Sequence, residues 1–402
     1  MQGCAPGYPP GLPSRGWTNR PQPARKRRSV VSSEVSATGI LRLKTQRHDA
    51  VYAMGHLIAG RDHTAPDWQD PRLLGWSNLL ATAVWPALDD ATRTRYAAEL
   101  EGFAVAYALN TDRNADLLTQ VERVVVRLNT AGIEPLILKG AAHLVTGLWP
   151  TPGARLVSDI DLLIEADALD TAFSALEDLA DAGPQDRGHP EIIALNKHML
   201  PVIGAGGPAA VELHHSIYQG AAARLAPPTD LLDRAEPIWL GDGRARVLSP
   251  TDRVLTAMLH GLAGSGTYLV PTLHMRDMLD IHFLAATYGQ RIDWGWIERH
   301  LAANRWAVAL EITNACLDRL TGMTPPFRRP GGLARLDAAR WVRQMERQAQ
   351  PARQVAMAAN HLVYTLRGLR AGGEPRRRVL ANLARPETYR FILRRYLLGQ
   401  TE

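Results

Sequence analysis

The sequence is poor in cysteine and in long apolar runs, and both shortages exclude whole classes of protein. Cys4 and Cys316 are the only cysteines among 402 residues, which argues against a disulfide framework and against a cysteine-based zinc site. No apolar run reaches the roughly 18 residues that a membrane span requires. The N-terminus also lacks the apolar stretch of a secretory signal. We therefore expect a cytoplasmic protein without a membrane span.

Charge is distributed unevenly along the chain. Residues 1–45 carry eight basic side chains against one acidic side chain, and residues 328–402 carry sixteen arginines against five acidic side chains. The middle of the chain is therefore acidic, which suits a metal-binding core flanked by surfaces that attract anions. The arginine-rich end allows RNA as a partner, although a genome that prefers arginine explains the same composition.

Changes in composition and in hydrophobic period predict five regions. They are a disordered basic arm over 1–45, a helical region over 46–131, an α/β core over 132–248, a helical subdomain over 249–325 and a basic helical region over 326–402. The proline-rich, basic composition of the arm is typical of disorder. Together the regions predict an α+β protein with a small mixed sheet surrounded by many helices.

Short apolar runs predict the strands of this sheet. The predicted strands are residues 134–138, 159–164 and 209–214, and residues 199–203 are a possible hairpin partner of the last. Helical periodicity predicts helices over 110–131, 141–148, 167–181, 250–263, 273–288, 293–303 and 304–321. Asn110 or Thr111 is the expected cap of the first helix, and Gly132 is its expected end. Ser249 followed by Pro250 is typical of a helix start.

The segment Asp159-Ile160-Asp161 carries the strongest chemical signal. Alternate side chains of a strand point to the same face, so both carboxylates project together while Ile160 points into the core. Two such charges repel each other unless a cation offsets them, and Mg²⁺ prefers oxygen ligands. An isolated Asp-x-Asp segment is also common at solvated strand edges. The apolar residues that follow favour a buried strand with an acidic pair at its mouth.

Glu212 is the third candidate carboxylate, and it lies on another short apolar run. Carboxylates from neighbouring strands can hold two metals, of which one neutralises a triphosphate and the other lowers the pKa of an acceptor hydroxyl. Glu212 or Asp161 would then act as the base. The alternative is that Glu212 is an ordinary edge-strand residue. We predict Asp159, Asp161 and Glu212 as catalytic and metal-binding residues.

Four further residues are candidates for binding the nucleotide. Lys139-Gly140 follows an apolar run, where glycine permits close approach of a phosphate to the backbone, although an ordinary tight turn explains the pair equally well. Arg155 is a candidate phosphate clamp, and Ser158 is placed to orient Asp159 or to cap a turn. The alternative is that Arg155 and Ser158 are ordinary surface residues.

In their order, these motifs resemble a poorly characterised bacterial nucleotidyltransferase family of the DNA polymerase β-type nucleotidyltransferase superfamily. The matching segments are Leu138-Lys139-Gly140, Arg155, Ser158-Asp159-Ile160-Asp161, Lys197-His198-Met199-Leu200-Pro201 and Glu212-Leu213-His214. Residues 276–280 and 292–294 also look similar. The resemblance covers roughly residues 46–325. Ala141 departs from the superfamily pattern, because it leaves no hydroxyl beside the phosphate turn.

The resemblance implies a metal-dependent enzyme that moves a nucleoside monophosphate from an NTP, such as ATP, to an acceptor. It implies Mg²⁺ or Mn²⁺ as the cofactor and the NTP as co-substrate, and it leaves the acceptor open between a small molecule, a peptide or protein, and RNA. The alternative is a non-catalytic nucleotide- or RNA-binding protein on a degenerate transferase fold. His198 and His214 are interpreted as groups that support the carboxylates rather than as a separate zinc site.

Overall fold

The structure is a computed structural model that describes residues 50–328, except residues 62, 64, 72, 77–79, 181–196, 219, 261 and 263–274. The predicted basic arm lies outside the described residues. Nearly all of the basic C-terminal region also lies outside the described residues. The possible contact of that region with RNA therefore stays untested.

A five-stranded mixed sheet forms the centre of the fold, with the strand order β3-β2-β1-β5-β4. The strands are β1 (Leu136–Ile137), β2 (Asp159–Leu163), β3 (Ala210–His214), β4 (Glu236–Leu240) and β5 (Gly243–Val247). β2 runs parallel to β3 and antiparallel to β1, which in turn runs parallel to β5. The three predicted strands are therefore neighbours, as expected, and the α+β class is confirmed. Isolated bridges from His198 to His214 and from Val202 to Val211 supply the expected pairing beside β3.

The hairpin of β4 and β5 was not predicted from the sequence. The two strands pair antiparallel around Gly241 and Asp242, and Gly241 has a φ of +55°. A glycine tolerates this left-handed conformation without steric cost. In β4, partly buried positions alternate with exposed ones, and Trp239 is 66% exposed. The segment therefore lacks the continuous apolar run that predicted the other strands.

Helix α5 (Glu101–Thr130) begins earlier than the predicted start at Asn110 or Thr111. Asn110 is not a cap but a buried residue inside the helix, and its side-chain amide donates hydrogen bonds to the carbonyls of Gly153 and Arg155 at 2.7 and 3.0 Å. Tertiary contacts therefore override the capping preference of asparagine. The predicted end is confirmed, because Gly132 follows the helix with a φ of +78°.

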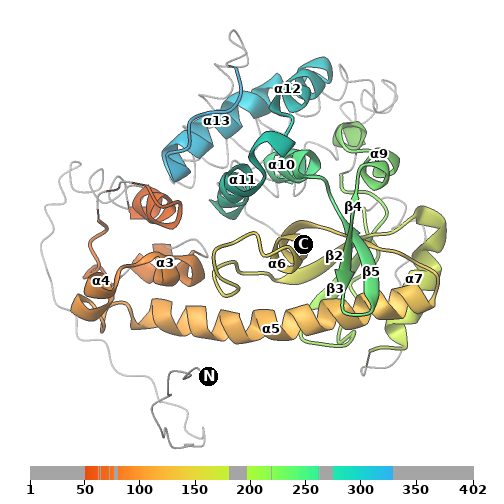
Figure 1. Cartoon of the computed structure of the whole chain (residues 1–402), viewed down its shortest axis with the longest axis horizontal. Coiled ribbons are helices and arrows are strands. Elements are labelled where there is room, and N and C mark those ends of the chain that lie inside the picture. The colour runs from red at the N-terminus through yellow and green to blue at the C-terminus, as the bar shows by residue number, and fades with distance from the viewer. Residues whose placement is uncertain are drawn as a thin grey trace, which may run out of the picture. The chain divides into compact units, whose positions relative to one another are not determined.

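The long helix α5 lies along the sheet and extends past it towards α3 (Ala81–Ala87) and α4 (Asp90–Arg95) (Figure 1). Its apolar stripe joins a buried cluster with β1, β2, β3 and α7 (Leu169–Glu177). The stripe consists of Leu117, Val121, Val124, Val125 and Leu128. The same helix thus supports both the sheet and the loops that lead into it.

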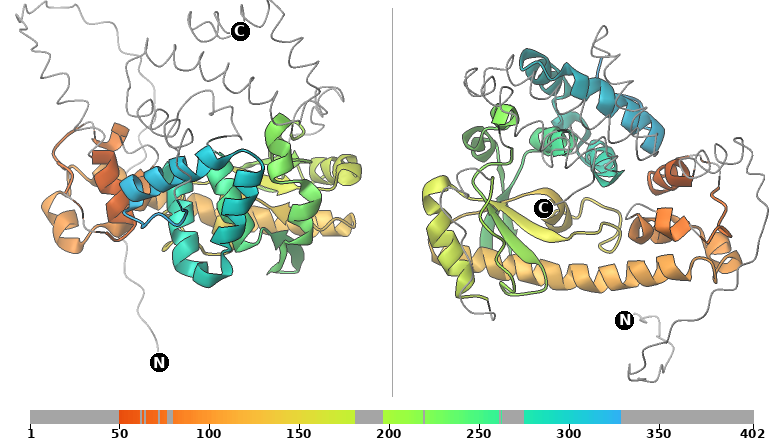
Figure 2. Two further views of the ribbon diagram at one scale, coloured as in Figure 1. Left: turned by 90° about the horizontal axis from the view of Figure 1, so that it is seen from above. Right: turned by 180° about the vertical axis from the view of Figure 1, so that it is seen from behind.

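A second group of helices lies on the other side of α6 (Lys139–Val145), as Figures 1 and 2 show. It comprises α10 (Pro250–Leu259), α11 (Met275–Tyr288), α12 (Trp294–Ala303) and α13 (Ala307–Thr321). The predicted start of α10 is confirmed, because Ser249 accepts a hydrogen bond from the Asp252 amide. Further short elements are α2 (Leu73–Trp76), α9 (Pro228–Asp233), η1 (Ala166–Ala168), η2 (Gly220–Leu225) and η4 (Gly289–Arg291).

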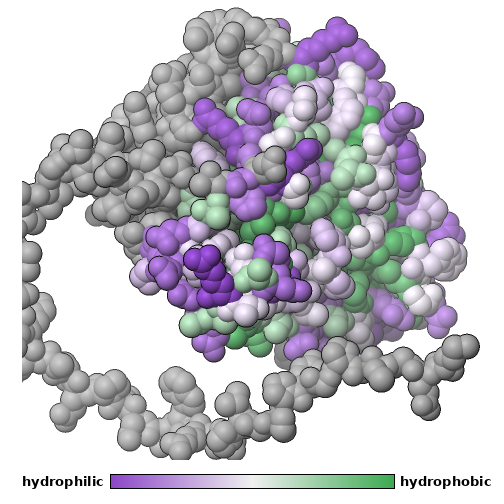
Figure 3. All heavy atoms as spheres, turned by 60° about the vertical axis from the view of Figure 1, so that its left-hand side comes forward, coloured by the Kyte–Doolittle hydropathy of each residue, from purple (hydrophilic) through white to green (hydrophobic). Residues whose placement is uncertain are grey.

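The described surface mixes apolar and polar residues. On the face shown in Figure 3, hydrophobic residues lie among hydrophilic ones. None of the helices that the structure describes is long and apolar enough to cross a membrane.

Candidate functional site

The pairing of β2 with β3 brings the central carboxylates together. The two strands are parallel, with Asp161 opposite Glu212 and Asp159 opposite Ala210. Because strand side chains alternate, Asp159 and Asp161 share one face while Ile160 points to the other. Ile160 is fully buried, and Asp161 is only 1% exposed. The predicted acidic pair therefore lies at a buried strand, not at a solvated edge.

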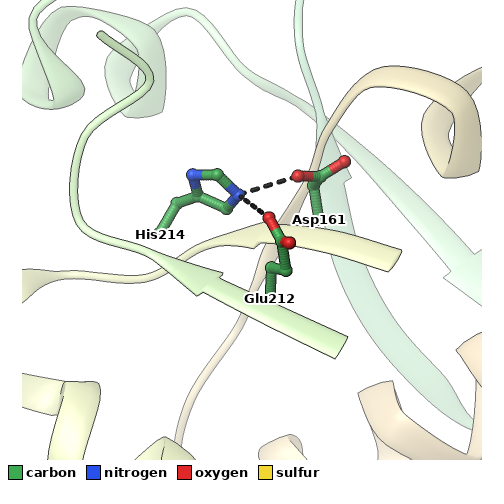
Figure 4. Close-up of side chains that lie close together, drawn as sticks. All are labelled: Asp161, Glu212 and His214. Carbon is green, nitrogen blue, oxygen red and sulfur yellow. Dashed lines mark hydrogen bonds and ion pairs between the residues drawn. The ribbon is translucent and has the colours of Figure 1, made fainter. Parts of the chain in front are cut away.

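Asp161, Glu212 and His214 converge, as Figure 4 shows. His214 Nε2 lies 2.7 Å from Oδ1 of Asp161 and 3.3 Å from Oε2 of Glu212. The ligand atoms of the three residues lie within 4.8 Å of one another, so the group could hold a metal ion. The sequence predicted the two carboxylates and placed His214 beside them, but it did not predict His214 as a possible ligand.

Positive charge stabilises these carboxylates in their ionised form. Lys139 Nζ lies 2.5 Å from the same Oδ1 of Asp161. Burial alone would raise the pKa of Asp161, but the hydrogen bond from His214 and the charge of Lys139 hold it well below its usual range. The hydrogen bond from His214 likewise lowers the pKa of Glu212, against the opposing effect of burial.

The pKa values of the two basic partners, His214 and Lys139, are raised rather than lowered. Burial alone would lower the pKa of His214, but its hydrogen bonds to Asp161 and Glu212 raise it. Burial would also lower the pKa of Lys139, and the charge of Asp161 raises it above its ordinary value. A cluster of two anions is therefore held by two basic side chains in this state.

The ligand atoms of Asp161, Glu212 and His214 are of types that bind divalent cations. Two carboxylates and an imidazole offer hard oxygen and borderline nitrogen ligands, and such mixed sets suit first-row divalent metals. The side chain of Lys139 is 27% exposed, so its flexible stem can withdraw when a metal takes over the charge of Asp161. The Nδ1 atom of His214 is buried and has no hydrogen-bond partner among the described residues, which leaves Nε2 as the nitrogen directed at the carboxylates.

Asp159 stands apart from this group. Its Oδ1 accepts a hydrogen bond from the Ser158 hydroxyl at 3.0 Å, which is the orienting contact expected of Ser158. Asp159 lines the cleft beside Lys139 and Gly140. Its role as a metal ligand stays a prediction.

Arg155 contacts a carboxylate that the sequence did not pair with it. Its Nε and Nη2 donate to the two oxygens of Asp280 on α11 at 2.8 and 2.6 Å, and Trp149 Nε1 donates to Oδ1 of the same residue. This bidentate pair occupies one edge of the guanidinium. A phosphate contact by Arg155 stays a prediction, and it would depend on Nη1, which approaches Gly140.

Lys139 and Gly140 form a strained turn at the start of α6. Lys139 has a φ of +49°, a conformation that L residues adopt only at some cost. A Cβ on Gly140 would lie 2.5 Å from Nη1 of Arg155, so glycine is required here by the neighbouring guanidinium. Both residues line the same cleft as Asp159, while a phosphate contact for them remains a prediction.

Polar side chains of α5 fix the loop that leads into β2. Asn114 donates to the carbonyls of Pro152 and Arg155, and Arg113 donates to the carbonyls of Val157 and Ser158. These contacts satisfy loop carbonyls that would otherwise be buried without partners. The position of Asp159 is thus set by α5 as well as by the sheet.

The cleft has a second wall that sequence reasoning missed. It comes from α10 and α11 and includes Arg253, His260, Arg276 and Asp277. His260 Nδ1 and Asp277 Oδ2 lie 2.9 Å apart. Lys197 also lines the cleft, and burial followed by the charge of Lys139 lowers its pKa. Lys197 belongs to the segment Lys197-His198-Met199-Leu200-Pro201 that matched the family pattern, but the sequence did not predict it as a site residue.

Comparison with known proteins places the chain in a family. A family model described as "Uncharacterised nucleotidyltransferase" matches residues 67–322. No curated protein and no solved structure matches the chain. The matched region contains the sheet, the convergent carboxylates and both walls of the cleft. Since it spans more than half of the sequence, the chain belongs to this family of uncharacterised nucleotidyltransferases, and nucleotidyl transfer is its supported reaction class.

Proposed function

We propose that the protein is a metal-dependent nucleotidyltransferase that moves a nucleoside monophosphate from an NTP to an acceptor. The observation that carries the proposal is the convergence of Asp161, Glu212 and His214 on adjacent strands. Asp161 is buried, and a buried carboxylate is costly unless it is paired or binds metal. Lys139, which contacts Asp161, lines the adjacent cleft.

In the proposed reaction, an acceptor oxygen attacks the α-phosphorus of the NTP. A new P–O bond forms, the bond between the α-phosphorus and its bridging oxygen breaks, and pyrophosphate leaves with the electron pair. The acceptor proton passes to a carboxylate of Glu212 or Asp161. Mg²⁺ or Mn²⁺, held by Asp161, Glu212 and His214 with Asp159 as a further predicted ligand, would supply charge neutralisation for the phosphates and acidify the acceptor hydroxyl.

The surrounding cations suit a polyphosphate substrate. Lys139 lies at the carboxylates, and Lys197 lines the same cleft. When a metal takes the charge of Asp161, the Lys139 ammonium becomes able to pair with a phosphate instead. ATP is the first NTP to test, and a small molecule, a peptide or protein, and RNA are the acceptor classes.

The test is incubation of the full chain with each α-³²P-labelled NTP and Mg²⁺ or Mn²⁺, followed by mass analysis of protein, RNA and small-molecule fractions. Transfer of label by the parent protein and its loss in Asp161→Asn would support the enzyme. Binding of an NTP with no label transferred to any fraction would support the alternative, a non-catalytic nucleotide-binding protein on this fold.

A further inference from the structure

Two arginines on the helical wall of the cleft have no carboxylate partner among the described residues. Arg253 lies on α10 and Arg276 on α11, and both line the cleft. The other cleft arginine, Arg155, is instead paired with Asp280 through both carboxylate oxygens. Within the described chain, Arg253 and Arg276 therefore lack the direct ion pair that Arg155 makes.

Arg276 has hydrogen-bond donors that no group in the described part of the chain uses. Its Nη1 donates to the carbonyl of Leu156 at 3.0 Å, and within the described part of the chain no hydrogen bond uses its Nε or Nη2 and no carboxylate pairs with it. The side chain is half-buried. Burial and the adjacent charge of Arg155 lower the pKa of Arg276, whereas the charges of Asp277, Asp280 and Asp159 act in the opposite direction.

Arg253 adds a fixed positive charge behind the cleft surface. It is 3% exposed, and its donors bind the Tyr288 hydroxyl, His143 Nδ1 and the Thr146 hydroxyl. The His143 imidazole is unprotonated, because burial lowers its pKa to about 3, so its Nδ1 can accept from Arg253. Arg253 therefore makes no direct ion pair among the described residues, while the charges of Asp280 and Glu236 favour its charged form.

Arg155 and Arg276 meet at one carbonyl. Nη1 of Arg155 lies 3.3 Å, and Nη1 of Arg276 3.0 Å, from the oxygen of Leu156. Two guanidiniums beside one oxygen repel each other, and only Arg155 has a carboxylate to offset its charge. An anion with several acceptor oxygens would satisfy the remaining edge of Arg276 and relieve this repulsion.

From this arrangement we infer that the helical wall is an anion subsite in which Arg276 binds a phosphate group of the acceptor. The inference rests on the proposed function, since it assigns the sheet wall to the donor NTP. The carboxylate group and Lys139 lie on the β2 side, whereas Arg253 and Arg276 come from α10 and α11. The acceptor is therefore a phosphate-bearing molecule.

Inorganic phosphate is the probe for this subsite. The midpoint of thermal unfolding of the full chain is measured against phosphate concentration, with chloride at equal ionic strength as the reference. Each titration is run with and without Mn²⁺ and a saturating α,β-methylene NTP analogue. We expect phosphate to raise the midpoint saturably in both conditions, because a ligand that binds only the folded state stabilises it.

Three variants separate binding from general salt effects. Arg276→Gln removes the charged fork and should weaken phosphate at least about tenfold, the value of one charge-assisted hydrogen bond. Arg276→Lys keeps a point charge and should give an intermediate loss. Arg224→Gln is the matched control, because Arg224 is also half-buried and donates to a backbone carbonyl, that of Asn304, but does not line the cleft. It should bind phosphate like the parent.

The outcomes distinguish the two proposals. A phosphate response that the NTP analogue abolishes would assign Arg276 to the donor triphosphate and overturn the acceptor subsite. An equal response in the parent and in Arg276→Gln would overturn it as well. If the analogue does not bind but phosphate binds in an Arg276-dependent manner, the anion subsite stands while the proposed transferase activity fails.

Discussion

The imidazole of His214 and the carboxylate of Asp161 meet across two parallel strands, with Nε2 2.7 Å from Oδ1. Lys139 contacts the same oxygen. A bare group of carboxylates would repel itself and favour any substitution that removes a charge. Here two basic side chains offset that repulsion, so Asp161 contributes to stability as well as to the proposed chemistry.

Asp161→Asn should therefore destabilise the metal-free protein. The change removes the anion that contacts Lys139 and leaves the buried His214 with Glu212 alone, and removal of one partner from a buried pair costs about 3 kcal/mol or more. Asp159→Asn is the matched control, because Asp159 shares the strand face and is bonded to Ser158 rather than to a cation. It should change the free energy of unfolding by no more than about 1 kcal/mol. Urea unfolding of both variants measures the difference, and equal stabilities would contradict the pairing.

Glu212→Gln should act on chemistry rather than on folding. Glu212 is partly exposed, with 21% of its side chain accessible, so loss of its charge should reduce the free energy of unfolding less than the loss of Asp161 does. Loss of a proton acceptor or metal ligand should reduce the rate of label transfer about 10²- to 10⁴-fold. Initial transfer rates and binding of the NTP analogue are measured together. A variant that transfers label at the parent rate would remove Glu212 from the proposed mechanism.

Gly140→Ala should destabilise the protein, because the new methyl group would meet a guanidinium that cannot move freely. The Cβ would lie 2.5 Å from Nη1 of Arg155, and Asp280 holds that side chain by two hydrogen bonds. Overpacking of this kind costs about 1–3 kcal/mol. Gly102→Ala is the control, since its Cβ would meet only the side chain of Leu74 and alanine favours the helix. Thermal melts should show opposite or clearly unequal shifts, and equal small shifts would contradict the fixed guanidinium.

The strands that form the site could be predicted because the residue pattern that marks each strand lies within that strand. Continuous apolar runs at residues 135–138 and 162–164 indicate burial on both faces. The two-residue period of a strand then forces Asp159 and Asp161 onto one face. Glu212 required one further step, the assumption that its strand lies beside that of Asp161, which the parallel pairing satisfies.

The remaining features depend on contacts between distant parts of the chain. Asn110 resembles a helix cap in sequence, but its amide binds loop carbonyls more than forty positions away, so the helix continues through it. Arg155 and Asp280 are separated by 125 positions, and no periodicity connects them. The helical wall with Arg276 was missed for the same reason, since its approach to Leu156 is a property of packing rather than of spacing.

His143 should make the folded protein sensitive to mild acid. The imidazole is buried, and it faces Arg253 on α10, Asp280 on α11, and Arg155. Burial, together with the charges of Arg253 and Arg155, lowers its pKa to about 3 despite the opposing charge of Asp280. Below pH about 6.5 the unfolded chain therefore binds a proton that the folded chain does not. The free energy of unfolding should then decrease by up to about 1.4 kcal/mol for each pH unit between 6 and 4 through this residue alone.

His143→Gln removes this titration while keeping a hydrogen-bond acceptor for Arg253. The difference in unfolding free energy between parent and variant should thus shrink as the pH falls from 7 to 4, because only the parent carries the proton-linked loss. The buried His282, whose pKa burial also lowers, contributes to both proteins and cancels in the difference. His63→Gln, which removes an exposed imidazole, is the control and should follow the parent at every pH. Urea unfolding at intervals of half a pH unit measures the slopes, and parallel curves for the parent and His143→Gln would show that His143 takes up its proton in the folded state.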